Sequence, residues 1–471
     1  MIPVCYLTII NINNMADSKS QEQEQQRNEI SYFQNPNSNL KVEFVTEGLS
    51  LPTSMAFIDG NNLLILEKEG QVRLVSNGVL QKQPVLKVAV DATVERGLLG
   101  IATINNDISN NNNANKNEDN SNNAKYRNIV KETLSLSGTT NPKIMTTTKK
   151  TLPIAKVFLY FTESKPGEPL RNAIYKYDWD PAKHLLLNPT LLLELPATPG
   201  PNHNGGKLAI GPDHYLYAII GNVNAGDSVL QNDRHGNGPH DTSVILRINP
   251  ENGAAAPGNP FSNIGNNNNG NSTTNKLNKY YAYGIRNSFG ISFDPISGNL
   301  WDTENGENTY DEINLVKPGF NSGWQQVMGP ISRSNITDKD LVNFRGSHYA
   351  DPVFSWLYCV GATDIEFLKS SKLGVKYANN IFVGDINNGN LYYLEVNKNR
   401  TGIKFGYDID NNQVGLLSDL VADDKNEVAA ITFATGFGGI TDIKTSPDDG
   451  FLYILSYANG ILYRIVPAAS H

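Results

Sequence analysis

Long apolar runs, long basic runs and cysteines are nearly absent from this chain of 471 residues. No segment reaches the ~18 consecutive apolar residues that a transmembrane helix needs, so we expect no membrane span. The lack of a long basic run argues against nucleic acid as a partner. Two cysteines, Cys5 and Cys359, cannot form a disulfide framework. Because Cys5 falls in a segment that we expect to be mobile, we expect no bridge between them, and the redox compartment stays open.

The residues that are present fit a soluble globular protein. Hydrophobic residues make up 39% of the chain and aromatic residues 9%, which is enough for a sizeable core. The formal net charge is −8 and the pI is near 5.5. An acidic balance of this size favours solubility and says little about the fold.

The first 40 residues differ from the rest of the chain. Met1–Ile10 is apolar but short, and it lacks the basic start of an export signal. It is either the remnant of such a signal or a frayed tail. Ala16–Glu29 is rich in Gln, Glu and Ser, which is typical of a disordered linker. We therefore predict that residues 1–40 form a disordered N-terminal segment.

A repeat runs through the remainder of the chain. Four passages each combine a short strand, a turn rich in Pro, Asp, Gly or Asn, and a second apolar strand: Met55–Gly70, Leu208–Gly221, Ile291–Asn305 and Ile443–Gly460. A third strand follows each passage. Two weaker copies begin at Leu99 and Ile365. The sequence therefore contains six similar units, a number typical of a propeller.

Apolar segments between the units supply a fourth, outer strand. These segments are Val85–Val88, Leu191–Leu195, Tyr280–Tyr283, Pro352–Trp356 and Val428–Phe433. The sixth outer strand is Val42–Val45, which would pair with the last unit and close the ring. We therefore predict an all-β six-bladed β-propeller over residues 41–467, with four-stranded antiparallel blades and a ring closed by the N-terminal strand. A β-sandwich is the alternative, but it does not require six similar units.

Two Asn-rich stretches interrupt the repeat, at about 104–151 and 262–278. Long surface insertions cost little closure entropy. We predict that both are disordered loops and assign them no chemistry.

Loops that enter the inner strands hold the candidate site residues. His203 lies among Gly and Asn residues in Gly200–Leu208, and histidine is the natural general base near neutral pH. The neighbouring Gly205 and Gly206 would let a flat ligand approach the backbone. The alternative is a loop histidine that caps a turn.

Two further loops carry charge. Tyr283–Phe293 contains Arg286 and Asn287, and arginine offers a rigid fork for carboxylates; the alternative is an arginine that satisfies loop carbonyls. Thr303–Asn314 holds four acidic residues, and oxygen-rich loops suit Ca²⁺. Its spacing does not match an EF-hand, and acidic turns are often simply solvated.

Taken together, these segments resemble the glucose/sorbosone dehydrogenase family, six-bladed propellers that oxidise sugars with pyrroloquinoline quinone (PQQ) and Ca²⁺. The resemblance runs from about Val42 to Val466. It rests on six motifs: ERGLLG (95–100), NHNGGKLAIGPD (202–213), YGIRNSFG (283–290), TENGENTYDEIN (303–314), GFNSGW (319–324) and TDIKTSPDDGFLYILS (441–456).

The resemblance implies roles for particular residues. His203 falls at the position of the general base, which takes a proton from the sugar's anomeric hydroxyl while hydride passes to PQQ. Glu95, Arg286 and Asn287 fall at cofactor-binding positions, although Glu95 replaces a Gln of the best-known members. The metal site implied for Ca²⁺ is the pair of backbone carbonyls of Gly306 and Glu307. An aldose substrate, an external electron acceptor and an extracytoplasmic or secreted location are implied as well.

The chain departs from the family where the cofactor's three carboxylates bind. Asn387, Gly439 and Thr441 stand at the positions of one Lys and two Arg. At about 1.5–3 kcal/mol for each charge-assisted hydrogen bond, losing three would weaken binding by roughly 4–9 kcal/mol. Lys207 or Arg234 are candidate substitutes that the sequence does not place at the site.

Two further departures touch the chemistry itself. Phe289 replaces a Gln, and Asn222 replaces the acid that orients the histidine. An amide cannot stabilise an imidazolium as a carboxylate does.

Three functions follow as hypotheses. The first is a PQQ- and Ca²⁺-dependent aldose dehydrogenase, or a variant with a rearranged cofactor site. The second is a non-enzymatic propeller that binds a carbohydrate or protein partner. The third is a Ca²⁺-dependent hydrolase of the lactonase type, which rests on analogy between folds alone.

Overall fold

The computed structural model describes residue 33 and residues 39–104, 155–262, 277–405 and 417–468. Within these ranges, none of the helices is both long enough and apolar enough to cross a membrane. Most of residues 1–40 and most of both Asn-rich insertions lie outside the described residues. The strands that flank the first insertion end at Ile104 and begin at Lys156, as the repeat predicts.

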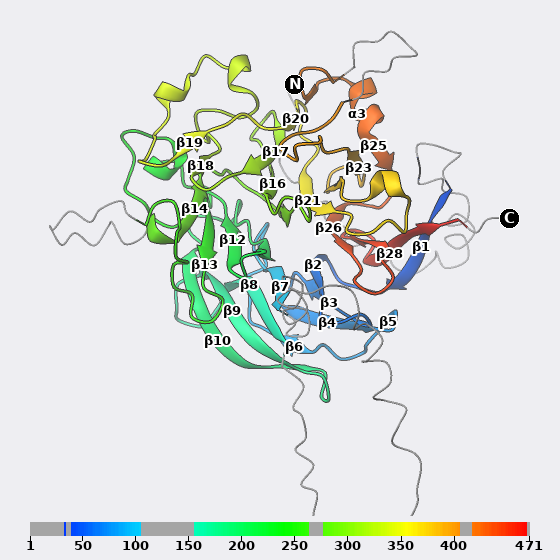
Figure 1. Cartoon of the computed structure of the whole chain (residues 1–471). Coiled ribbons are helices and arrows are strands. Elements are labelled where there is room, and N and C mark those ends of the chain that lie inside the picture. The colour runs from blue at the N-terminus through cyan, green and yellow to red at the C-terminus, as the bar shows by residue number, and fades with distance from the viewer. Residues whose placement is uncertain (1–32, 34–38, 105–154, 263–276, 406–416, 469–471) are drawn as a thin grey trace, which may run out of the picture.

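Six sheets form the blades of the propeller (Figure 1). Blade one has β2 (Pro52–Phe57), β3 (Asn62–Glu67), β4 (Gln71–Ser76) and the short β5 (Val79–Leu80) and β6 (Leu86–Lys87). Blade two has β7 (Leu98–Ile104), β8 (Lys156–Glu163), β9 (Arg171–Asp180) and β10 (Leu185–Pro196). Blade three has β11 (Leu208–Ile210), β12 (Leu216–Ile220), β13 (Val244–Ile248) and β14 (Tyr280–Tyr283), extended by the parallel β18 (Phe320–Asn321) and β19 (His348–Tyr349).

The remaining blades repeat the plan. Blade four has β15 (Gly290–Phe293), β16 (Leu300–Glu304), β17 (Asp311–Val316) and β20 (Phe354–Trp356), extended by the parallel β24 (Val421–Ala422). Blade five has β21 (Ala362–Phe367), β22 (Ile381–Asp385), β23 (Leu391–Leu394) and β25 (Thr432–Ala434). Blade six has β26 (Ile440–Thr445), β27 (Leu452–Ser456), β28 (Ile461–Pro467) and β1 (Leu40–Glu47). Short helices lie between strands: α3 (Lys425–Ile431) and 3₁₀ turns at Val229–Gln231, Ile331–Arg333, Asp338–Asp340 and Val375–Tyr377.

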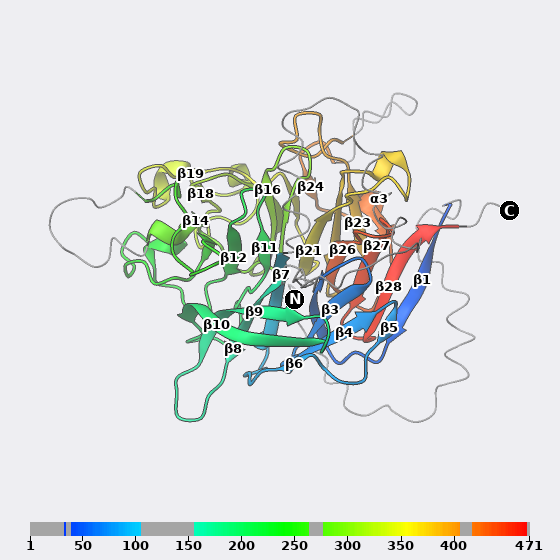
Figure 2. The same cartoon turned by 60° about the horizontal axis from the view of Figure 1, so that its bottom comes forward.

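The N-terminal strand closes the ring, as predicted. β1 runs antiparallel to β28, from Leu40 opposite Pro467 to Glu47 opposite Ile461, with a bulge between Phe44 and Thr46. Figure 2 shows the two strands side by side at the edge of the molecule. The inner strands β2, β7, β11, β15, β21 and β26 contact one another in sequence around the centre, and β26 returns to β2. All six blades therefore share one central channel.

Six hydrophobic clusters fill the spaces between neighbouring blades. Successive residues of a strand point to opposite faces, so each strand contributes to two clusters. In β3, Leu64 and Leu66 pack against blade two, whereas Leu63 and Ile65 pack against blade six. Burial on both faces explains why the second strand of each unit is apolar almost throughout.

Some predicted details were wrong. The expected outer strand Val428–Phe433 is largely helix, because Asp424 caps the backbone N–H groups of Asn426 and Glu427 and so starts α3; only Thr432–Ala434 is strand. Not every blade has four strands, since blades three and four gain short parallel strands and the outer strand of blade one is split. Cys359 is disulfide-bonded, against expectation, and Cys5 lies outside the described residues.

Candidate functional site

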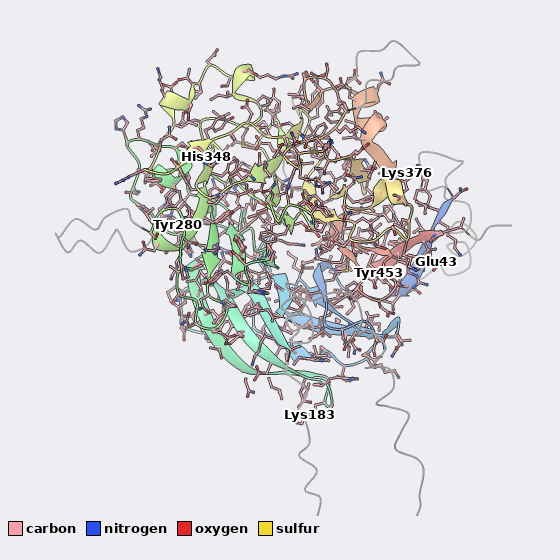
Figure 3. The ribbon with its side chains drawn as sticks, viewed as in Figure 1. Glu43, Lys183, Tyr280, His348, Lys376 and Tyr453 are labelled. Atoms are coloured by element: carbon pink, nitrogen blue, oxygen red, sulfur yellow. The ribbon has the colours of Figure 1, made fainter. Side chains whose placement is uncertain are left out.

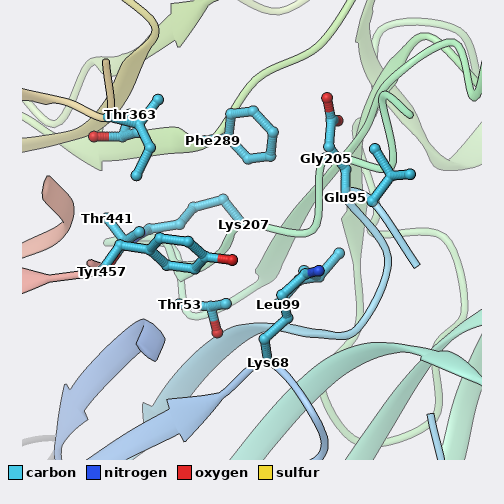
Figure 4. A pocket seen from close by; sticks show the side chains of 12 residues that line it. Thr53, Lys68, Glu95, Leu99, Gly205, Lys207, Phe289, Thr363, Thr441 and Tyr457 are labelled. Carbon is cyan, nitrogen blue, oxygen red and sulfur yellow. The ribbon is translucent and has the colours of Figure 1, made fainter. Parts of the chain in front are cut away.

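A cavity opens at the end of the channel where the inner strands begin. Each inner strand contributes a residue at or next to its start: Thr53, Leu99, Lys207, Phe289, Thr363 and Thr441. The turns after the second strands of three blades add Lys68, Ile386 and Tyr457, and the loop before β7 adds Val94 and Glu95. Figure 4 shows these side chains, drawn from all six blades, around one space. The loops that the sequence singled out therefore do converge.

The wall of this channel cavity is mainly apolar, although three threonines line it. Each hydroxyl donates to the carbonyl of the neighbouring inner strand: Thr53 to Leu98 at 2.6 Å, Thr363 to Ile440 at 2.7 Å and Thr441 to Pro52 at 2.9 Å. The aromatic rings of Phe289 and Tyr457 complete the wall. A surface of this kind suits a flat, largely apolar ligand.

A smaller cavity adjoins the first and is lined mostly by polar groups. Glu95 lines both cavities. His203, Arg286, Asn287 and Asp311 line only the smaller one. The predicted base and all three predicted cofactor-binding residues therefore lie together, between blades one to four.

The hydrogen bonds around His203 define its tautomer. Its Nδ1 lies 2.6 Å from Oδ1 of Asn222. The same amide oxygen accepts the backbone N–H of Asn224 at 3.2 Å, so this atom is the oxygen of the amide. Nδ1 therefore carries the proton, and Nε2 is the nitrogen that can accept one. Burial, and then the charge of Arg286, lower the pKa of His203 to about 4, against the opposing effect of the Asn222 hydrogen bond.

Replacing Asn222 by Asp tests whether the partner of Nδ1 controls the pKa of His203. A carboxylate 2.6 Å from Nδ1 should raise the pKa of His203 from about 4 to between about 5 and 7. The neutral ring would then be lost as the pH falls through that higher value. The measurement is a pH titration of the imidazole signals by NMR, with the His203 signal assigned by its loss in His203→Asn.

The matched control is Asn224→Asp, which adds the same charge where the side chain accepts from the backbone of Asn202 instead. An Asn222→Asp protein whose His203 still titrates near pH 4 would contradict the account.

Glu95 holds the loop of His203 in place. Its Oε2 accepts the backbone N–H of His203 at 2.6 Å and the side-chain amide of Asn287 at 3.0 Å. The amide oxygen of Asn287 in turn accepts the N–H of Gly205 at 3.3 Å. Burial raises the pKa of Glu95, while the bonds from His203 and Asn287 oppose that rise. Glu95 and Asn287 thus join the loops of blades two, three and four.

Arg286 is a buried cation that donates to a loop carbonyl, which is the alternative that the sequence analysis states for it. One guanidinium N–H donates to the carbonyl of Asn305 at 3.0 Å, and the guanidinium lies 5.3 Å from the ring centre of Trp324. Its Nε has no hydrogen-bond partner in the described protein. The guanidinium is thus buried beside the smaller cavity with donors that the protein leaves unused.

Three buried charged residues and one that is partly exposed lie in the channel beneath the larger cavity. Lys207 Nζ lies 2.9 Å from Asp364 and 3.0 Å from Asp442, at ion-pair distance but without hydrogen-bond geometry. Lys444 Nζ lies 2.6 and 2.7 Å from the same two carboxylates. Burial opposes ionisation of Asp442, but Lys207 and Lys444 lower its pKa. We call these four residues the ion quartet. Lys207 faces the channel cavity and Lys444 a hollow at the opposite end of the channel.

The acidic loop between β16 and β17 organises the backbone. Asp311 accepts the N–H groups of Gly306, Gly361 and Ala362 at 3.1, 2.6 and 3.1 Å. A side chain at Gly306 would collide with the carbonyl of Thr309, which lies 2.0 Å from the position of a Cβ. Glu307 is exposed. In the described part of the chain, no three Asp, Glu, His or Cys side chains gather to hold a metal. A Ca²⁺ site on the carbonyls of Gly306 and Glu307 stays a prediction.

Asn387, Gly439 and Thr441 stand where the family has a Lys and two Arg, and two of these three residues line the cavities. Asn387 lines the smaller cavity and Thr441 the larger one. Gly439 has a φ of +87°, and a Cβ there would lie 2.9 Å from the carbonyl of Ile386, so an arginine would be strained. Of the two candidate substitutes, Lys207 reaches the cavity, whereas Arg234 donates to the carbonyls of Lys339, Asp340 and Leu341 away from it. Sequence reasoning missed Lys68 and Tyr457, since a lysine or tyrosine in a turn gives no signal of its own.

Comparison with known proteins identifies the family. The glucose/sorbosone dehydrogenase family model matches residues 153–464. An uncharacterized protein of Synechocystis is 23% identical over 457 residues, which cover 93% of this chain and 89% of that protein. The aldose sugar dehydrogenase of Escherichia coli is 24% identical over 280 residues, 59% of this chain and 64% of the enzyme. The solved PQQ-bound aldose sugar dehydrogenase of Streptomyces coelicolor has the same fold, with a TM-score of 0.57, 22% identity and coverage of 92% and 99%. The propeller and its motifs thus agree with the family model, and this chain belongs to the glucose/sorbosone dehydrogenase family.

Proposed function

We propose that the protein is an oxidoreductase that oxidises the anomeric hydroxyl of an aldose to a lactone, with PQQ as the hydride acceptor. The observation that carries the proposal is the state of His203. Its ring is neutral, its Nδ1 is occupied by Asn222, and its Nε2 is available beside a cavity. A neutral, oriented imidazole is what general-base catalysis on a hydroxyl requires.

The residues present fit PQQ, a flat ring system with three carboxylates. The apolar wall with Phe289 and Tyr457 suits the rings. Among the residues that the structure describes, neither Lys68 nor Arg286 forms an ion pair, and Nε of Arg286 is a buried donor without a hydrogen-bond partner. The residues that would hold the cofactor are Glu95, Arg286 and Asn287, with Ca²⁺ on the carbonyls of Gly306 and Glu307. When bound, PQQ supplies the two-electron acceptor and Ca²⁺ polarises it.

The protein's own part in the reaction is to position the sugar and to remove a proton. Nε2 of His203 would take the proton of the anomeric hydroxyl as the hydride leaves the carbon that bears this hydroxyl. The imidazolium that forms is disfavoured by burial and by the nearby charge of Arg286. The proton would therefore pass on to solvent readily, which restores the neutral base for the next turnover.

The electron acceptor and the location belong to the same proposal. A reduced cofactor needs an external acceptor before it can react again. We propose an extracytoplasmic or secreted location, because a disulfide-bonded Cys359 suits an oxidising compartment. Recovery of the native protein only from the cytosolic fraction would contradict that location.

A second candidate is a propeller without enzymatic activity that binds a carbohydrate or a protein. It is favoured by the missing basic residues at Asn387, Gly439 and Thr441. A glycan array and a pull-down that both remain blank would count against it.

Titration separates these candidates. Metal-depleted protein would be titrated with PQQ in the presence of Ca²⁺ by calorimetry, and then assayed for dye reduction with a panel of aldoses. We expect saturable binding and sugar-dependent reduction. The control omits Ca²⁺. A protein that binds no PQQ at high micromolar concentration would rule out the dehydrogenase and leave the binding propeller.

A further inference from the structure

Lys68 is a buried lysine at the edge of the channel cavity, and none of the described carboxylates forms an ion pair with it. It follows β3, and 8% of the residue is exposed. Its ammonium donates to the carbonyl of Ala92 at 2.6 Å and forms no ion pair with any described residue. An ammonium has three donors, so most of its hydrogen-bonding capacity is unused. Burial lowers the pKa of Lys68, an effect that the charges of Glu69, Asp91 and Glu95 oppose.

The other lysine of the cavity differs from Lys68 in this respect. Lys207 lies within 3.0 Å of the carboxylates of Asp364 and Asp442, and Lys444 contacts the same two carboxylates. An anionic ligand would gain little from a lysine that is already neutralised. Of these two lysines that line the cavity, Lys68 is the one that forms no ion pair within the described part of the chain.

The place of Lys68 in the ring also matters. The cations expected on blade six are replaced by Gly439 and Thr441. Thr441 donates to the carbonyl of Pro52 in the adjoining blade one, and Lys68 belongs to blade one. Lys68 and Thr441 line the same cavity. A positive charge is therefore present one blade further around the ring from the positions that lack it.

We propose that Lys68 binds a carboxylate of the ligand in the channel cavity and so replaces part of the missing cationic clamp. This role rests on the proposed function, which supplies a ligand with carboxylates. A charge-assisted hydrogen bond from an ammonium to a carboxylate is short and strong in a water-poor site. The desolvation of Lys68 is already present in the free protein, so ligand binding gains the contact without that cost.

The test compares two ligands by calorimetry: PQQ with Ca²⁺, and 9,10-phenanthrenequinone, a flat tricyclic quinone without carboxylates. Lys68→Gln keeps a donor for Ala92 but removes the charge. We expect its affinity for PQQ to fall about 10- to 100-fold and its affinity for phenanthrenequinone to stay unchanged. The salt dependence of PQQ binding should fall as well.

The control is Lys183→Gln, which removes the same charge at an exposed hairpin tip far from the channel (Figure 3). It should bind both quinones like the wild type. Equal PQQ affinity in Lys68→Gln and wild type would overturn the role of Lys68 alone. Equal loss for both quinones would also overturn it, since that is the signature of a damaged cavity. A wild-type protein that does not bind PQQ would overturn the proposed function together with this role.

Discussion

His203→Asn is expected to lower the rate of aldose oxidation by the PQQ-loaded protein about 100- to 10,000-fold, the range that one general base contributes. The replacement is chosen to disturb the structure little. The side-chain amide of Asn offers an N–H at the place of Nδ1, so it can still donate to Asn222. The backbone of residue 203 has a φ of +59°, which Asn tolerates better than most residues. What disappears is the acceptor at Nε2.

The measurement is a steady-state assay of dye reduction, together with calorimetric titration of PQQ. We expect the rate to fall while the affinity for PQQ changes far less, because the proposed role of His203 is to act on the sugar. The control is His214→Asn, an exposed histidine that also has a positive φ, of +65°, at the turn between β11 and β12. If His203→Asn oxidised aldoses as fast as the His214 variant, His203 could not be the base.

Asp442→Asn is expected to lower the free energy of unfolding by about 3–5 kcal/mol, the cost of breaking a buried ion pair. Asp442 is fully buried, and its two oxygens meet Lys207, Lys444, Ser54 and the N–H of Met55. An amide keeps the shape but leaves the buried Lys207 and the partly exposed Lys444 with the carboxylate of Asp364 alone. Denaturant titration and thermal unfolding would measure the loss.

Asp448→Asn is the control, because it removes a charge from an exposed position in the same blade. A second variant, Asp442→Asn with Lys207→Met, removes one positive and one negative charge. It should recover part of the lost stability, since fewer buried charges then lack a partner. An Asp442→Asn protein as stable as the Asp448 variant would show that the ion quartet adds no stability.

The fold was predictable because its repeat is local. Each blade depends on strands a few residues apart, and burial on both faces makes strands such as β3 and β12 apolar almost throughout. Details that depend on other forces were not predictable in the same way. The helix α3 begins at a capping box formed by Asp424 and Glu427, whereas the apolar run Val428–Phe433 by itself favours a strand. The parallel pairing of β18, β19 and β24 joins short segments distant in sequence.

The candidate site was predictable to the extent that it lies in loops next to inner strands. His203, Glu95, Arg286 and Asn287 meet because those strands share one channel. The charges that complete the site could not be predicted. Lys68 is isolated in a turn, and Asp364 and Lys207 are brought together by closure of the ring. The sequence therefore pointed to the candidate base, His203, more readily than to the charged groups around it.

The ion quartet divides the central channel into two separate cavities. Lys207 forms part of the floor of one cavity, Lys444 opens to the hollow at the far end, and the two carboxylates between them are fully buried. The ion quartet thus lies between the channel cavity and the hollow at the opposite end of the channel. If the sugar and the electron acceptor of the proposed function both enter the cavity beside His203, they would bind there one after the other and not together.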